Sequence, residues 1–236
     1  MAVDIRWFDD NASLAPALAA AVAADLRKGL ATRSRVSLAV SGGRSPVPVF
    51  EALRQEALDW SRVIVTLVDE RWVPETDPAS NAALVKAHLL QDKAAAASFI
   101  PLYTGEITAR LAEATLAESF GQVPQPFSAL ILGMGDDGHT ASLFPASPYL
   151  EAGLALAGSI SDTLPCLAQV GAVAPTERMS LTLPWILAAQ TVYLQFGGAN
   201  KIDVFNQASL GIDRQYPVSF VLNQTTTPVR VFAART

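Results

Sequence analysis

The sequence predicts one α/β domain built on a doubly wound, mostly parallel sheet, and three observations predict it. Short apolar runs with β-branched or aromatic residues alternate along the chain with helical stretches, several of which begin on Ser, Thr or Asn. Such alternation is typical of a parallel sheet with helices on both faces. The chain has 236 residues, 50% of them hydrophobic, enough for one large core. No connection is long enough to divide it, so we expect a single domain over residues 1–236.

The elements are predicted in chain order. An alanine-rich stretch over residues 11–30, with Asn11 and Ser13 as capping candidates and Gly29 near its end, predicts the first helix. Apolar runs predict buried strands at residues 36–40, 63–68, 129–132 and 192–196. Further helices are predicted at residues 47–58, 81–90, 108–120 and 200–208. Since ligands of such sheets bind beyond the carboxyl ends of the strands, the loops that follow the strands are the candidate functional segments.

Composition and charge argue against several classes of function. The net charge is −5 and the isoelectric point is about 5.0, whereas nucleic-acid binding needs a basic surface, so we expect no nucleic-acid partner. The longest uncharged stretch, residues 179–200, is interrupted by Pro184 and by Gly197-Gly198, so we expect no membrane span. The first residues lack a signal-peptide pattern, and the single Cys166 favours a reducing compartment. We therefore expect a cytoplasmic protein.

The loop after the first strand, SGGRSP at residues 41–46, is a candidate phosphate cradle. Its glycines allow a sharp turn, its N–H groups can surround an oxyanion, and Pro46 suits the first turn of the following helix. It is not a Walker A loop, because no Gly-Lys-Ser/Thr follows. On this motif alone, an ordinary strand-to-helix turn is an equally good interpretation.

The loop after the second strand, residues 69–81, carries Arg71 close to the strand end. A guanidinium there is a candidate to hold an anion or to stabilise a developing oxyanion. Taken alone, an ion pair of Arg71 with Asp69 or Glu70 is the better interpretation, since most surface charge pairs have no further role.

The third strand leads into GMGDDGHTASLFP at residues 133–145. This stretch contains Gly-x-Gly-x-x-Gly, the dinucleotide fingerprint, but two aspartates would lie where the pyrophosphate binds, and Pro145 leaves little room for the long helix that normally follows. His139 lies two residues after Asp137, close enough for the carboxylate to orient the imidazole. An imidazole carries protons well at neutral pH, so this arrangement predicts a general base.

Other roles for the titratable residues are weaker. A lone histidine is more often structural, but His139 lies among glycines at a strand end, and this favours function. His88 lies inside a predicted helix and receives no role. No Gly-x-Ser-x-Gly elbow exposes a serine nucleophile. One histidine with scattered acids lacks the spacing of metal ligands, so we predict neither a metal nor a cofactor.

Two later loops each supply a cation. Arg178 lies in ERMSLTLP at residues 177–184, and Lys201 ends the FGGANK segment. Either can give fixed positive charge to a phosphate whose other contacts are the N–H groups of residues 42–45. Lys201 is the more unusual of the two, because a cation at a helix start opposes the helix dipole.

Taken together and in this order, VSGGRSP, VDERWVPETDPASN, GMGDDGHTASLFP, ERMSLTLP and GGANK closely resemble the 6-phosphogluconolactonase family over residues 36–209. The resemblance implies a Rossmann-like sheet of the sugar-phosphate isomerase/deaminase type. It also implies hydrolysis of 6-phospho-D-glucono-1,5-lactone to 6-phosphogluconate in the oxidative pentose phosphate pathway. The expected partner is then a small sugar-phosphate lactone. We expect a monomer, although the sequence carries no feature against an oligomer.

The resemblance further implies a role for each matching residue. His139 is the base for water attack on the lactone carbonyl, Arg71 stabilises the oxyanion and Asp137 supports the histidine. The residues implied to surround the sugar phosphate are Ser41, Gly42, Gly43, Arg44, Ser45, Arg178 and Lys201.

Two alternatives remain open. Related deaminases share the fold and the Asp-Gly-His element but carry a glutamate directly before the proline, where this chain has Phe144, and this difference favours a lactonase over an amino-sugar-phosphate deaminase or isomerase. The second alternative is a non-catalytic sugar-phosphate-binding module, which the same fold permits.

One segment differs from the lactonase pattern. Residues 171–176 lack the lysine and the extra prolines that the pattern has before Glu177-Arg178.

Overall fold

The computed structural model describes residues 3–156 and 160–236, and among them the main sheet has seven strands. Their spatial order is β1-β10-β9-β6-β2-β3-β5, and every adjacent pair is parallel. The strands are β1 (Asp4–Phe8), β2 (Val36–Val40), β3 (Val63–Leu67), β5 (Ser98–Ile100), β6 (Ala129–Gly133), β9 (Val192–Gly197) and β10 (Val229–Ala234). The predicted doubly wound parallel sheet is therefore confirmed.

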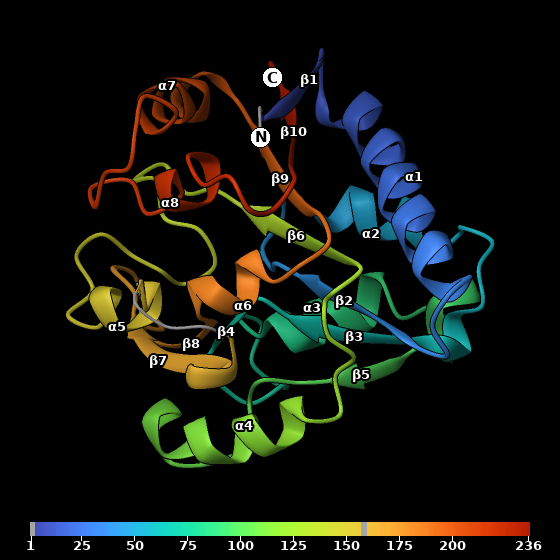
Figure 1. Cartoon of the computed structure of the whole chain (residues 1–236), viewed down its shortest axis with the longest axis horizontal. Coiled ribbons are helices and arrows are strands. Elements are labelled where there is room, and N and C mark those ends of the chain that lie inside the picture. Colours follow the sequence, from blue (N-terminus) through green and yellow to red (C-terminus); the bar gives the residue numbers. More distant parts are fainter. Residues whose placement is uncertain (1–2, 157–159) are drawn as a thin grey trace.

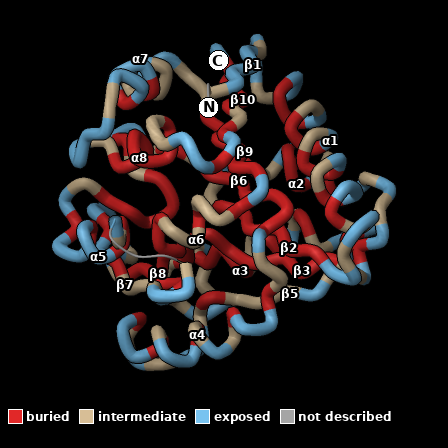
Figure 2. Tube along the Cα trace, viewed as in Figure 1, coloured by how far each residue is buried: buried red, intermediate tan, exposed pale blue. Residues whose placement is uncertain are grey.

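Helices cover both faces of this sheet. The helices are α1 (Asn11–Leu30), α2 (Val47–Leu53), α3 (Asn81–His88), α4 (Glu113–Phe120), α5 (Leu150–Leu154), α6 (Leu183–Leu187), α7 (Ala199–Ala208) and α8 (Ser219–Leu222). In Figure 1, α1 and α2 lie along one face, while α6 and α8 lie on the other. The central strands are buried and the exposed residues lie on the periphery, as Figure 2 shows.

The predicted helices exist, but α2, α3 and α4 are shorter than predicted. Helix α4 begins at Glu113 and not at residue 108, because residues 109–112 form a 3₁₀ turn. Asp10 is the N-cap of α1, because its side chain accepts from the N–H of Ser13 at 2.8 Å, so the capping candidates Asn11 and Ser13 are wrong. Helix α2 ends at Leu53 and α3 at His88, before the predicted ends at residues 58 and 90. No helix of the described residues is both long and apolar enough to cross a bilayer.

The chain changes direction within the sheet between β2 and β6. From β2 it runs outward through β3 to β5, and then it returns to β6 on the other side of β2 and runs through β9 to β10. The loops that leave β2 and β6 therefore diverge and open a crevice at the carboxyl ends of these strands. The two glycine-rich loops at residues 41–46 and 133–145 begin at this point.

A second, antiparallel sheet was not predicted. Its strands are β4 (Asp69–Arg71), β8 (Glu177–Leu181) and β7 (Cys166–Val170), in the order β4-β8-β7. The predicted loop over residues 177–184 is wrong, because most of it forms β8 and the start of α6. The sequence gives no local sign of β4, since it is only three residues long and charged. Its pairing with β8 sets Arg71 directly opposite Arg178.

Candidate active site

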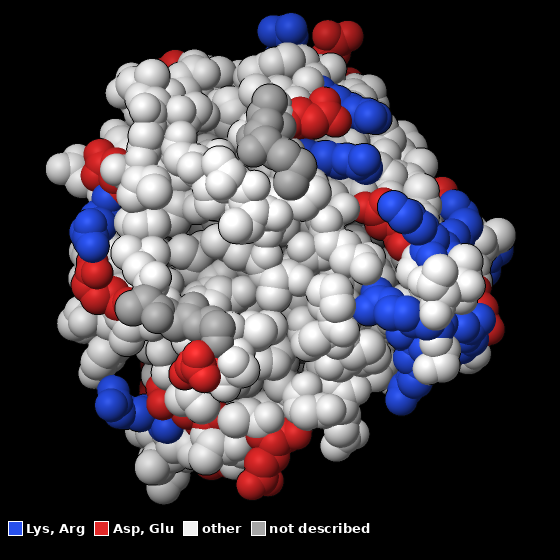
Figure 3. Space-filling view, in the orientation of Figure 1, with Lys and Arg blue, Asp and Glu red and all other residues white. Residues whose placement is uncertain are grey.

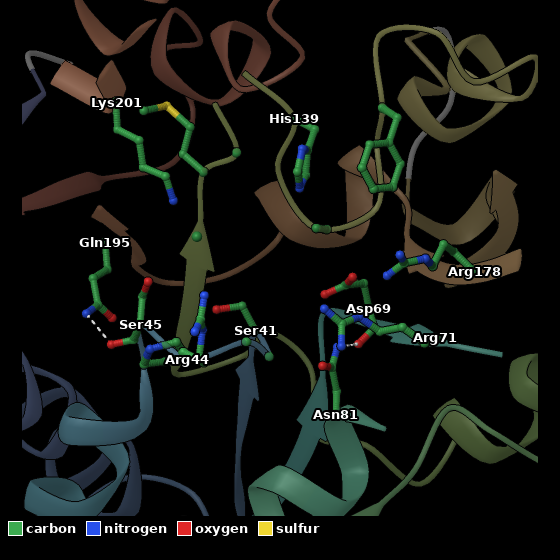
Figure 4. A pocket seen from close by; sticks show the side chains of 18 residues that line it. Ser41, Arg44, Ser45, Asp69, Arg71, Asn81, His139, Arg178, Gln195 and Lys201 are labelled. Atoms are coloured by element: carbon green, nitrogen blue, oxygen red, sulfur yellow. Dashed lines mark hydrogen bonds between the residues drawn. The ribbon is translucent and has the colours of Figure 1, made fainter. Parts of the chain in front are cut away.

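A cavity of about 220 Å³ lies at the crevice between the two glycine-rich loops, and Figure 4 shows its lining side chains. Every predicted site residue except Asp137 lines it: Ser41, Gly42, Gly43, Arg44, Ser45, Arg71, His139, Arg178 and Lys201. Three buried polar residues that were not predicted also line it, namely Asp69, Asn81 and Gln195. The fold thus brings together side chains from both sheets, from the loops that follow β2 and β6, and from the first turns of α3 and α7.

The loop over residues 41–45 offers unpaired donors to this cavity. The N–H of Ser41 donates to the Ile131 carbonyl at 3.0 Å and so continues the sheet. Within the described chain, the N–H groups of residues 42–45 donate to no protein acceptor. Successive backbone N–H groups that line a concave surface form an anion site. Residues 42–45 are half-buried or exposed, so a ligand in the cavity can reach them. The loop can therefore receive a phosphate.

His139 is held by Asp137, as the sequence predicts. Its Nδ1 lies 2.5 Å from Asp137 Oδ1, and its backbone N–H donates to the same oxygen at 3.1 Å. Because an ionised carboxylate can only accept, Nδ1 carries the proton and Nε2 is left with a free lone pair. The ring projects from its loop into the cavity (Figure 4).

Gly135 leaves the space that the His139–Asp137 contact needs. A Cβ at residue 135 would lie 2.1 Å from His139 Nδ1 and 2.7 Å from Asp137 Oδ1. Any side chain there would push the imidazole away from its carboxylate. This glycine, which at first suggests a dinucleotide fingerprint, instead makes room for the His139–Asp137 pair.

The pKa of Asp137 is set by two opposing effects. Burial tends to raise it, but the hydrogen bond and the charge of His139 outweigh burial and lower the pKa of this carboxyl below its ordinary value. Asp137 is thus ionised throughout the neutral range.

Replacing Asp137 with asparagine tests whether this carboxylate supports the histidine. The amide oxygen can still accept from Nδ1, but the negative charge beside the imidazole is gone. We expect kcat to fall by about tenfold, less than for loss of the base itself. An unchanged kcat in a folded Asp137→Asn variant, measured by steady-state kinetics, would contradict a role for the charge of Asp137.

Arg71 and Arg178 form a cationic pair on one side of the cavity. Arg71 Nη1 donates to the Ala79 carbonyl at 2.6 Å, and Arg178 Nη2 donates to the Val173 carbonyl at 3.1 Å. The buried Nε atom of each arginine has no protein partner in the described chain. Among the described residues no carboxylate forms an ion pair with Arg71, so the alternative of a simple pair with Asp69 or Glu70 is wrong.

The electrostatics of this pair favour an anionic ligand. Burial lowers the pKa of Arg178, the charge of Arg71 lowers it further, and Asp69 and Glu70 partly oppose both effects. Two guanidinium groups with unused donors repel one another unless a negative charge lies between them. An oxyanion or phosphate oxygen at this point supplies both the charge and the acceptor.

Glu70 fixes the loop that carries Arg71. Its fully buried carboxylate accepts from the N–H groups of Arg71, Asn81 and Ala82 at 2.7–2.8 Å, which closes the loop over residues 71–81 onto the start of α3. Burial raises the pKa of Glu70 to about 7 although these donors oppose the rise.

Asn81 was predicted to begin a helix. It does so with Ser80 as the cap, which leaves the Asn81 side chain free to line the cavity.

Phe144 contacts both His139 and Arg178 in the wall of the cavity. Its ring centroid lies 4.3 Å from that of His139, and the guanidinium carbon of Arg178 lies 5.8 Å from the same ring. Phe144 therefore covers one side of the imidazole from water. It has no proton to transfer at the position where the related deaminases carry a glutamate.

Lys201 and Arg44 supply charge on the other side of the cavity. Figure 4 shows Lys201, Gln195, Ser45 and Arg44 on the side away from Arg71 and Arg178, with Ser41 between the two groups. In the part of the chain that the structure describes, neither Lys201 nor Arg44 forms an ion pair. Their charges are thus available to a ligand.

The cationic cavity contrasts with the chain as a whole, whose net charge is −5. On the face seen in Figure 3, acidic and basic side chains lie mostly towards the edge, and both signs occur. Among the described residues, no group of three or more His, Cys, Asp or Glu side chains is arranged to hold a metal ion. The concentration of unpaired cations inside the cavity is therefore the main electrostatic feature of the site.

The parallel sheet, the unpaired loop N–H groups and the His139–Asp137 pair define an α/β protein whose small cavity combines several cations with a carboxylate-bound histidine, an arrangement that suits an anionic ligand and proton transfer. Residues 9–230 match the family described as glucosamine-6-phosphate isomerases/6-phosphogluconolactonase. The chain belongs to this family.

Individual relatives agree with this assignment. The 6-phosphogluconolactonase of Pseudomonas aeruginosa is 42% identical over 226 residues, which cover 95% of this chain and 93% of that protein. That of Rhizobium meliloti is 37% identical over 235 residues, covering 99% and 100%. The crystal structure of a 6-phosphogluconolactonase from Shewanella baltica aligns with a TM-score of 0.92 at 38% identity, covering 98% of this chain and 97% of that one.

Proposed function

We propose that this protein is a 6-phosphogluconolactonase, which hydrolyses 6-phospho-D-glucono-1,5-lactone to 6-phosphogluconate in the oxidative pentose phosphate pathway. The observation that carries the proposal is the position of the His139–Asp137 pair in the same cavity as the open donors of residues 42–45. A base and a phosphate cradle in one small cavity suit a phosphorylated substrate with a carbonyl that water can attack.

In the proposed mechanism, the free Nε2 of His139 takes a proton from a water molecule as the water oxygen bonds to the lactone carbonyl carbon. The carbonyl oxygen becomes an oxyanion, and Arg71 stabilises it. When the tetrahedral intermediate collapses, the bond from this carbon to the ring oxygen breaks. The protonated His139 then gives its proton to that oxygen, which leaves as the hydroxyl of the open-chain acid.

In this proposal the phosphate of the substrate lies among Ser41, the N–H groups of residues 42–45, Arg44 and Lys201, and the charge of Arg178 acts on it from the opposite side of the cavity, beside Arg71. The phosphate takes no part in bond breaking. Its contacts hold the reacting carbonyl near His139 and so convert binding energy into orientation. Since residues of both sheets line the cavity, we also propose that residues 1–236 act as one catalytic domain. The monomeric state and the cytoplasmic location stay predictions.

Purified protein assayed on 6-phosphogluconolactone tests the proposal, with ammonia release from glucosamine 6-phosphate measured in parallel. Loss of the lactone at a rate well above its spontaneous hydrolysis, without ammonia release, is the expected result. Ammonia release would instead point to a deaminase. Binding of the sugar phosphate without any turnover would point to a binding module.

Lys201→Ala tests the phosphate contacts. A charged donor to phosphate typically contributes enough for about a tenfold effect or more, so kcat/KM for the phosphorylated lactone is expected to fall by about 10- to 100-fold. The ratio of kcat/KM between 6-phosphogluconolactone and gluconolactone should fall with it. Lys28→Ala, which removes an exposed lysine from α1, is the matched control for charge. An unchanged ratio for Lys201→Ala would remove Lys201 from the phosphate site.

A further inference from the structure

Gln195 is a buried amide in a strand that is otherwise apolar. It lies near the carboxyl end of β9 between Leu194 and Phe196, and only 4% of its surface is exposed. An amide is costly to bury unless its donors and acceptors are paired. An apolar side chain would fill this position in a strand at lower cost, so the amide needs a reason that lies outside the strand.

The partner of Gln195 is the loop that offers its N–H groups to the cavity. Gln195 Nε2 donates to the Ser45 carbonyl oxygen at 3.0 Å, and Figure 4 shows this bond at the edge of the cavity. Only the NH₂ group of the amide can donate to a carbonyl, so its orientation is fixed. This bond holds the Ser45 carbonyl in place. Without it, the carbonyl oxygen could turn toward an anion in the cavity and repel it.

The opposite end of the same loop rests on a second buried amide. Asn81 is 1% exposed, and its Nδ2 donates to the Asp69 carbonyl at 2.9 Å. A Cβ on Gly42 would lie 1.8 Å from Asn81 Oδ1, so the loop backbone packs directly on this side chain. Asn81 therefore supports Gly42, and Gln195 supports Ser45. The N–H groups of residues 42–45 keep no protein acceptor in the described chain.

We infer that Gln195 is a positioning residue for phosphate recognition. It holds the Ser45 carbonyl away from the anion and keeps residues 42–45 in the shape that presents their N–H groups. Through this loop it contributes to the preference for a phosphorylated over an unphosphorylated lactone. The inference rests on the proposed function for its choice of substrate, but its physical content is the affinity of the loop for phosphate.

Gln195→Met is the principal test, because methionine has nearly the same length and lacks the amide. Loss of one positioning hydrogen bond is expected to lower the ratio of kcat/KM between 6-phosphogluconolactone and gluconolactone by about five- to tenfold. The loss should appear mainly as a higher KM for the phosphorylated lactone and as an equally weaker inhibition by inorganic phosphate. Gln195→Glu, which places a carboxylate beside the phosphate, is expected to lower the ratio further.

Thr66→Val is the matched control. Thr66 is also a fully buried polar residue of the main sheet, its Oγ1 donates to the Ile100 carbonyl at 2.8 Å, and it does not line the cavity. This variant is expected to lower the melting temperature without changing the substrate ratio. If Gln195→Met behaves in the same way, the amide has only a structural role and the inference is wrong.

A second variant and a phosphate-binding measurement test the role of Gln195 independently of the proposed activity. If Gln195→Met does not fold, Gln195→Asn retains the amide on a shorter side chain and should show a smaller fall in the ratio; an unchanged ratio overturns the inference. If the parent protein does not hydrolyse the phosphorylated lactone, the proposed function fails, but inorganic phosphate binding to the parent and to Gln195→Met, measured by calorimetry, still decides the role of Gln195. Equal affinities would overturn it.

Discussion

Replacing His139 with alanine is expected to lower kcat on 6-phosphogluconolactone by about 10²- to 10⁴-fold, the usual contribution of a general base. The imidazole has its Nδ1 occupied by Asp137 at 2.5 Å, so Nε2 is the nitrogen that can accept the proton of water. KM should change little, because the phosphate contacts lie on other loops. Steady-state rates against the spontaneous hydrolysis of the lactone give the measurement.

His88→Ala is the control for this experiment. His88 is the other histidine of the chain, and it lies at the end of α3, pairs with Glu51 at 3.1 Å and does not line the cavity. Its removal should leave kcat unchanged. Full activity of a folded His139→Ala variant would show that the water is activated in another way. Partial recovery of that variant by added imidazole would support the assignment.

Replacing Arg71 with alanine is expected to have the second-largest effect, a fall in kcat of about 10²- to 10³-fold, as for loss of one oxyanion donor. Arg71 lies opposite Arg178 in the β4–β8 pair, and its buried Nε has no protein partner in the described chain. Its remaining donors are therefore available where the carbonyl oxygen gains negative charge. Parallel measurement of kcat and KM tests whether the loss falls on the transition state.

The Arg71 experiment needs a control for its loop, because Nη1 also holds the Ala79 carbonyl. Arg71→Lys keeps the charge but not the forked donors, so it should recover only part of the rate. Added guanidinium should restore some activity to Arg71→Ala if the loop is intact. An Arg71→Ala variant that loses melting temperature but retains kcat would assign Arg71 to the fold alone.

The sequence predicts the elements that have a clear local pattern. Helix α1 and the strands β2, β3, β6 and β9 are found close to their predicted bounds, because each contains enough consecutive apolar residues to form part of the core. The edge strand β1 is exposed along most of its length, so its residues carry no such signal. β5 and β4 have only three residues each, too few for a periodicity to appear.

The candidate site is predictable only in part, because some of its residues have no local signal in the sequence. Glycines, His139 and isolated cations at strand ends stand out in a sequence because their chemistry is unusual there. Gln195 and Asp69 do not stand out, although Gln195 is the one polar residue in the middle of an apolar strand. That pattern is a usable signal, since a buried amide implies a hydrogen-bond partner elsewhere.

By itself, the sequence determined most of the strand and helix pattern and the contact between Asp137 and His139, because a carboxylate two residues before a histidine is a local relation. Tertiary structure decided which groups share a cavity. The Arg71–Arg178 pairing joins residues 107 positions apart, and the Gln195–Ser45 bond joins residues 150 positions apart. Such contacts form only when the order of strands in the sheet and the packing of the second sheet bring distant segments together, and neither is a property of a short stretch of chain.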